Sequence, residues 1–158
     1  MIRLLSVYHG GRDPQHRGRE RALEATGVEV TLVVPLRGRT LRGPNLSPEP
    51  FGVIELPARR AGDVNRHANV EGGALRRIIV ETRPDVLDLH EEPVSVVARQ
   101  WLRAASGLPV VMYTAQDLDE RFPPPFSRFE AAAYRGVGAC TRAVAKLRPE
   151  SAPRALPE

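Results

Sequence analysis

All four histidines of this 158-residue sequence lie close behind short apolar runs. They are His9 and His16 after residues 2–8, His67 after residues 52–56, and His90 at the end of residues 86–90. If these runs are parallel strands, their carboxyl ends share one edge of a sheet, where α/β proteins bind ligands. The sequence therefore predicts a polar cleft at that edge. The alternative is that each histidine is an ordinary polar loop residue.

Carboxylates follow the same apolar runs. Glu91 and Glu92 come directly after His90, and Asp117 follows the apolar residues 110–113. Because neighbouring residues of a strand point to opposite faces, His90 and Glu91 cannot simply share one metal ion. We therefore expect no metal site, and we assign the acidic side chains to the same predicted cleft.

Gly10 and Gly11 form a short loop after the first apolar run, and Arg12 follows them. Without Cβ atoms, two glycines allow a ligand to approach the backbone closely. The helix expected from Arg17 would point its amino terminus at the same place, which favours an anion. A plain strand-to-helix turn explains the spacing equally well.

Several motifs of nucleotide and acyl-transfer chemistry are missing from the sequence. The only lysine, Lys146, does not stand in a Gly-Lys-Ser/Thr sequence, which excludes a P-loop. The loop after residues 2–8 does not match the Gly-x-Gly-x-x-Gly dinucleotide fingerprint, and no serine forms a nucleophile elbow. Cys140 has no basic neighbour, so we expect a buried, inert thiol. No cofactor is predicted.

Apolar runs alternate with helical patterns along the chain. We expect strands at residues 2–8, 28–34, 52–56, 86–90, 110–113 and 137–140, and helices at residues 17–26, 74–82, 94–105, 126–135 and 141–147. This alternation is typical of parallel βαβ units, and the unbroken apolar strands indicate that helices cover both faces. The predicted fold is a doubly wound, Rossmann-like parallel α/β sheet of five or six strands, with the first strand central. It occupies residues 1–148, and residues 149–158 form an irregular tail.

Composition and charge exclude several classes of protein. Hydrophobic residues make up 42% and charged residues 27% of the chain, as in an ordinary globular domain. A single cysteine cannot form an internal disulfide, and no apolar stretch is long enough to span a bilayer, so we expect a cytoplasmic protein. The net charge of +4 is concentrated in residues 1–43, a field that attracts phosphates. Nucleic acid is disfavoured because aromatic residues make up only 5% of the chain.

Three segments resemble the amino-terminal domain of a family 4 glycosyltransferase of the GT-B fold. The first is the Gly-Gly loop with the helix and strand of "ALEATGVEVTLVVP", the second is "RPDVLDLHEEP", and the third is "FSRFEAAAYRGVGACTRAVAKLR". The resemblance extends over residues 1–148, and the order and spacing of the three segments carry it.

This resemblance implies retaining transfer of a sugar from a nucleotide-sugar donor to a sugar or lipid acceptor, usually without a metal. In such a domain His90 would be the catalytic residue that faces the transferred sugar, and Glu130 would be structural. The residues against the donor diphosphate would be Gly10, Gly11 and Arg12. The residues that bind the acceptor would be His9, His16, Glu91, Glu92 and Asp117.

The sequence departs from the family because the second Rossmann-like domain, which holds the nucleotide, is missing. We therefore expect the acceptor half of a truncated, split or excised enzyme, inactive alone, with the missing domain as its partner. Peripheral contact with a membrane is a further option. Two alternatives stay open: a non-catalytic domain that binds an acidic ligand or partner through residues 1–43, and another small-molecule enzyme on the same type of sheet.

Overall fold

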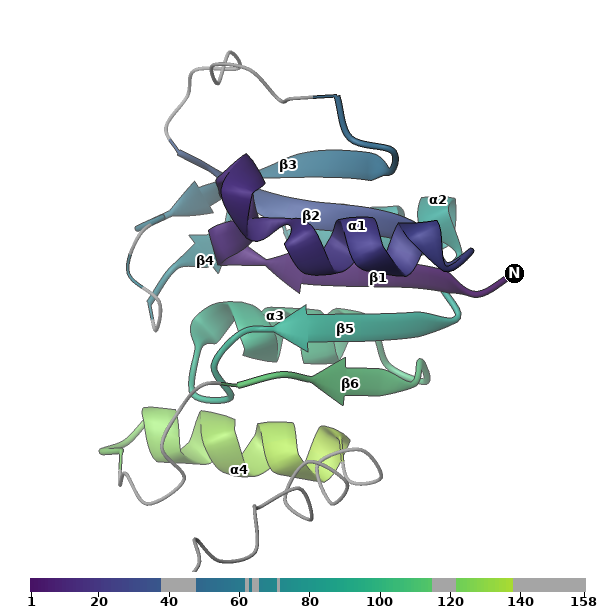
Figure 1. Ribbon diagram of the computed structural model, residues 1–158. Helices are drawn as coiled ribbons and strands as arrows, with labels where there is room; N and C mark the ends of the chain where they lie inside the picture. Colours follow the sequence, from purple (N-terminus) through teal and green to yellow (C-terminus); the bar gives the residue numbers. More distant parts are fainter. Residues whose placement is uncertain (38–47, 62, 64–65, 71, 115–121, 138–158) are drawn as a thin grey trace, which may run out of the picture.

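The computed structural model describes residues 1–37, 48–61, 63, 66–70, 72–114 and 122–137. These residues contain a six-stranded sheet in the order β4-β3-β2-β1-β5-β6 (Figure 1). The strands are β1 (Arg3–Tyr8), β2 (Glu29–Arg37), β3 (Gly52–Arg59), β4 (Ala68–Asn69), β5 (Val86–His90) and β6 (Val110–Met112). All neighbouring strands are parallel except β4, which is antiparallel to β3. This is the Rossmann-like α/β fold that the sequence predicts.

Helices cover both faces of the sheet. They are α1 (Gly18–Ala25), α2 (Gly72–Thr82), α3 (Val96–Ala104) and α4 (Phe126–Gly136), and two short 3-10 turns, η1 (His9–Arg12) and η2 (Pro14–His16), precede α1. In Figure 1, α1 lies in front of the sheet, whereas α2 and α3 lie behind it. α4 packs beside α3, near the edge strand β6. Within the described ranges, no helix combines the length and the apolar character needed to cross a bilayer.

The central strand is β1, as predicted. From β1 the chain first adds β2 and β3 on one side and later β5 and β6 on the other side. The carboxyl ends of β1 and β5 therefore meet where the direction of winding reverses, which is the ligand-binding position of open α/β sheets. Tyr8 pairs with His90 in register, so His9 and His90 lie at the same edge of the sheet, and this prediction is confirmed.

Two hydrophobic clusters form the core, one on each face of the sheet. The larger cluster joins β1 and β5 to α2 and α3, and it includes Leu5, Leu89 and the fully buried Trp101. The smaller cluster is built mainly from β2, with Leu32 at its centre, and Leu23 of α1 packs against it. Because successive strand residues point to opposite faces, β1 and β2 contribute to both clusters.

Local sequence signals explain where two of the helices begin and end. The Ser95 hydroxyl accepts a hydrogen bond from the Ala98 backbone N–H at 3.1 Å and caps α3. A cap of this type stabilises a helix by about 1 kcal/mol. Gly27 follows α1 with a φ of +88°, a conformation that disfavours side chains with a Cβ atom, so the chain can leave the helix and enter β2 there.

Several boundaries differ from the sequence-based expectation, and some predicted elements lie outside the described residues. The sequence predicts that Pro35 ends its strand, but β2 continues to Arg37. Pro35 lies beyond the last residue pair of β1 with β2, so its missing N–H is not needed for a hydrogen bond to β1 there. β4 is too short for any periodicity, and the sequence predicts only a loop in its place. Of the predicted strand at 137–140 and helix at 141–147, only Val137 is described, where it caps α4. The predicted tail at 149–158 also lies outside the described residues.

Helix α2 offers a matched test of the core. Ile78 is 6% exposed and Val80 is 71% exposed, and both are β-branched residues of the same helix. We expect Ile78→Ala to lower the free energy of unfolding by about 2–5 kcal/mol, because it leaves a cavity under the helix. Val80→Ala should change it by less than about 0.5 kcal/mol. Urea denaturation measures both values, and equal losses would contradict the placement of α2.

Candidate functional site

The carboxyl ends of β1 and β5 bring His9 and Glu91 into direct contact. The backbone N–H of His9 donates a hydrogen bond to Oε1 of Glu91 at 2.7 Å. The Nδ1 atom of His9 lies 2.9 Å from Oε2 of the same carboxylate. Glu91 is thus hydrogen-bonded to both the backbone and the ring of His9. With its proton on Nδ1, the imidazole leaves Nε2 free to accept a proton from a ligand.

Glu91 is almost fully buried, whereas one third of the His9 side chain is exposed. The hydrogen bond that the His9 ring makes to the Glu91 carboxylate raises the pKa of His9, and burial opposes this effect. His67, which precedes β4, adds a second imidazole, with its Nε2 atom 3.9 Å from Oε2 of Glu91. The arrangement is an oriented, partly exposed imidazole with a raised pKa that can take up or release a proton.

His90 occupies a different environment on the α1 face of the sheet. Its ring stacks on Tyr8 with centroids 4.1 Å apart, and the ring of Tyr113 meets it edge-on at 4.3 Å. Burial, together with the positive charge of Arg19, lowers the pKa of His90 to about 4. Its buried Nδ1 atom has no hydrogen-bond partner among the described residues. At neutral pH His90 is therefore an uncharged ring that can donate one hydrogen bond and accept another, but it is not in its acidic, doubly protonated form.

A buried polar cluster lies next to this ring. Arg19 of α1 forms ion pairs with Glu20 at 2.8 Å and with Asp88 of β5 at 2.5 Å. The hydroxyl of Ser6, which pairs with Asp88 in register, donates to Glu20 at 3.2 Å. Burial raises the pKa of Asp88, although Arg19 opposes the shift. Sequence reasoning missed this cluster, and its only signal is that Ser6 and Asp88 each interrupt an apolar strand.

The Gly10-Gly11 loop folds as the 3-10 turn η1 rather than as an open cradle. A Cβ atom on Gly10 would clash with the Tyr8 hydroxyl, so the Tyr8 ring occupies the space that the glycine leaves. Arg17 is fully buried beneath the loop, and its Nε donates to the Gly11 carbonyl at 2.5 Å. The helix begins at Gly18, after a second 3-10 turn, and not at Arg17 as predicted. The donor-binding role of the loop stays a prediction.

The remaining predicted site residues lie at or near the same edge. His16 ends η2, and its Nδ1 atom is 3.2 Å from the Gly10 carbonyl oxygen. Arg12 is exposed at the end of η1. Glu92 accepts a hydrogen bond from the Thr114 hydroxyl at 2.5 Å, which links the segments after β5 and β6. Asp117 lies outside the described residues. Within the described ranges, no three His, Cys, Asp or Glu side chains are grouped closely enough to hold a metal ion.

The comparisons with known proteins give similar structures but no family. No protein-family model matches the sequence, and no curated protein matches it either. One similar structure is the NAD-dependent NDP-hexosamine 5,6-dehydratase TunA, involved in tunicamycin biosynthesis, with 19% identity over 97% of this chain and 52% of that one, and a TM-score of 0.39. Another is MoeE5 in complex with UDP-glucuronic acid and NAD, with 15% identity, coverage of 88% and 49%, and a TM-score of 0.39. The chain thus spans about half the length of each.

The contact between His9 and Glu91 predicts a measurable pKa. In an NMR titration, His9 should titrate above the ordinary histidine value of about 6.5, and Glu91→Gln should bring it back toward that value. Because the pKa of His9 is higher in the folded than in the unfolded chain, protonation of His9 stabilises the fold. This contribution to the free energy of unfolding is complete below the pKa of the unfolded chain, and it is lost as the pH rises through the pKa of the folded chain. An unchanged His9 titration in the Glu91→Gln variant would contradict the geometry.

The opposite pKa shift of His90 predicts a second pH effect. The pKa of His90 in the folded chain is lowered to about 4, so the fold favours the neutral ring. The resulting contribution to the free energy of unfolding is complete above the pKa of His90 in the unfolded chain, and it is lost as the pH falls from that value toward 4. His90→Phe keeps a ring against Tyr8 but cannot take up a proton. Thermal unfolding between pH 4 and 6.5 should therefore depend less on pH in this variant than in the unsubstituted chain. The same pH dependence in both proteins would show that His90 is protonated without cost.

Proposed function

We propose that this chain is the acceptor-binding half of a retaining glycosyltransferase that uses a nucleotide-sugar donor. The observation that carries the proposal is the pair formed by His9 and Glu91 beside an uncharged His90 at the reversal point of the sheet. The segment that contains His90 and Glu91 is also one of the three segments whose order and spacing resemble the family. The proposal thus rests on the geometry and on the resemblance together.

The chemistry of sugar transfer matches what these side chains can do. The bond between the sugar C1 atom and the diphosphate oxygen breaks, a bond from C1 to the acceptor oxygen forms, and the acceptor hydroxyl loses its proton. His9, held by Glu91, is suited to accept that proton through Nε2, and the diphosphate leaves with the bonding electron pair. His90 is suited to hold a sugar hydroxyl by a hydrogen bond, because it is uncharged and flanked by Tyr8 and Tyr113.

The alternative of an acidic ligand bound through residues 1–43 has less support. Four arginines of this segment already form ion pairs with carboxylates. They are Arg3 with Asp85, Arg17 and Arg21 with Glu49, and Arg19 with Glu20 and Asp88. These pairs cancel much of the positive field that the sequence suggests for this part of the chain.

Activity measurements test the proposal at two levels. We expect residues 1–158 alone to transfer no sugar, because the proposal assigns the groups that would stabilise the leaving diphosphate to a nucleotide-binding partner domain. When a nucleotide-binding partner domain restores transfer, His9→Gln should lower kcat by roughly 10²–10⁴-fold, the contribution of a general base. Arg12 is exposed, and Arg12→Gln should instead raise the KM for the nucleotide-sugar donor.

The controls separate this proposal from other chemistry. Arg12 serves better than the glycines, because a Cβ atom on Gly11 would lie 3.1 Å from a Tyr8 ring carbon and 3.2 Å from a Leu32 methyl group. Substitution of Gly11 would therefore disturb packing as well as binding. Titration of the chain with NAD, UDP-sugars and GDP-sugars forms the second control. Tight binding of NAD with consumption of a sugar nucleotide by oxidation would reject glycosyl transfer, and robust transfer by the chain alone would reject the half-enzyme interpretation.

A further inference from the structure

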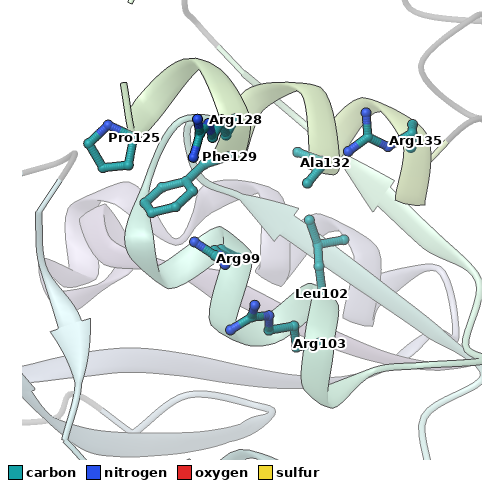
Figure 2. Close-up of a pocket in the computed structure, with 9 residues that line it drawn as sticks. Arg99, Leu102, Arg103, Pro125, Arg128, Phe129, Ala132 and Arg135 are labelled. Carbon is teal, nitrogen blue, oxygen red and sulfur yellow. The ribbon is translucent and has the colours of Figure 1, made fainter. Parts of the chain in front are cut away.

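A pocket of about 520 Å³ lies between α3 and α4 (Figure 2). It shares no lining residue with the site at the carboxyl edge of the sheet. Four arginines line it: Arg99 and Arg103 from α3, and Arg128 and Arg135 from α4. Among the described residues that line it, none is acidic. The walls thus carry four positive charges, and the rest of the lining is apolar.

Helix stability does not explain this arrangement. Arg99 and Arg103 are four residues apart on α3, a spacing at which like charges repel one another across one helical turn. Four guanidinium groups around one pocket repel one another further, and an anion between them would relieve that repulsion. The placement therefore favours a bound anion over an empty pocket.

These arginines differ from the arginines near the amino terminus. Arg17 and Arg19 are held by buried or nearly buried carboxylates, as described above. For the four pocket arginines, the described part of the chain provides no carboxylate within ion-pair distance. The guanidinium carbon of Arg99 lies 4.3 Å from the centre of the Phe129 ring, which holds that side chain at the pocket wall. The pocket thus groups four arginines that have no ion pair within the described structure.

The dimensions of the pocket indicate the kind of anion. Its volume lies within the range of about 300–1,000 Å³ that is usual for small-molecule sites. With a rise of about 1.5 Å per residue, the two α3 arginines are about 6 Å apart along their helix, and the two α4 arginines are about 10 Å apart. Guanidinium groups recognise phosphate oxygens through paired hydrogen bonds. A chain of two or three phosphate groups matches this spacing better than a single ion.

We propose that the pocket between α3 and α4 binds a small soluble ligand that carries at least two phosphate groups, such as a pyrophosphate or a polyphosphate moiety. This inference does not depend on the function proposed for the carboxyl edge. Nucleic acid is a weaker match, because single-stranded nucleic acid needs free aromatic faces for stacking, and Arg99 already occupies a face of Phe129.

Calorimetric titration of the whole 158-residue chain with sodium tripolyphosphate, pyrophosphate and orthophosphate tests the proposal. We expect one tripolyphosphate per chain, with affinity that decreases from tripolyphosphate to orthophosphate and falls as salt is added. The double variant Arg103→Gln/Arg128→Gln should weaken tripolyphosphate binding at least about tenfold, because it removes two charged hydrogen-bonding groups. The control Arg77→Gln removes an exposed arginine of α2 that does not line the pocket, and it should change the affinity less than about twofold.

Folding and competition complete the test. Arg103 and Arg128 are exposed, so the double variant should unfold at the same temperature as the unsubstituted chain when no ligand is present. If it does not, Arg135→Gln is measured in its place, with a tenfold loss expected again. The absence of tripolyphosphate binding, or equal losses in the pocket variants and in Arg77→Gln, would overturn the proposal. Tighter binding of single-stranded DNA or of vesicles of acidic phospholipid, lost in the same variants, would also overturn it in favour of a macromolecular surface.

Discussion

The register between β1 and β5 is the constraint on which the rest of this structure depends. It pairs Ser6 with Asp88 and Tyr8 with His90, and it sets the residues that follow each strand side by side. Parallel pairing of two central strands needs a long connection, which here includes β2, β3, β4 and α2. A slip of one residue would move Leu87 and Leu89 away from the larger core cluster and would expose them. Burial of these leucines therefore fixes the positions of the polar residues at the strand ends.

The same register separates two histidines into opposite electrostatic environments. His9 contacts a buried carboxylate, which favours its protonated form and raises its pKa. His90 lies between two tyrosine rings and near Arg19, where burial and positive charge both favour the neutral form and lower its pKa. At one edge of the sheet, His9 is therefore the side chain suited to proton exchange, and the neutral His90 is the one suited to hydrogen bonding. Environments that push pKa values apart in this way are a common property of acid–base sites.

The distribution of positive charge in space differs from its distribution along the chain. The sequence places the excess in residues 1–43, yet Glu49, Asp85 and Asp88, which lie later in the chain, compensate arginines of that segment. By contrast, residues 44–158 balance in sequence but contribute the arginines of the α3–α4 pocket. Long-range ion pairs of this kind cannot be read from the order of residues, because they depend on which elements pack together. A local count of charges therefore does not show where positive charge gathers among the described residues.

The sequence alone determined the α/β class, the central position of β1, and each helix and longer strand to within a few residues. Apolar periodicity and the flanking glycines and prolines carry that information locally, as in residues 86–90, whose strand has the predicted bounds. It also identified His9, His90 and Glu91 as residues of one edge, since strand direction alone fixes which ends meet. Only the tertiary structure decided that Glu91 grips His9, that Tyr8 fills the space beside Gly10, and that Arg19 bridges two buried carboxylates. Such contacts join side chains from separate elements, and their geometry is set by packing across the sheet rather than by any local pattern in the chain.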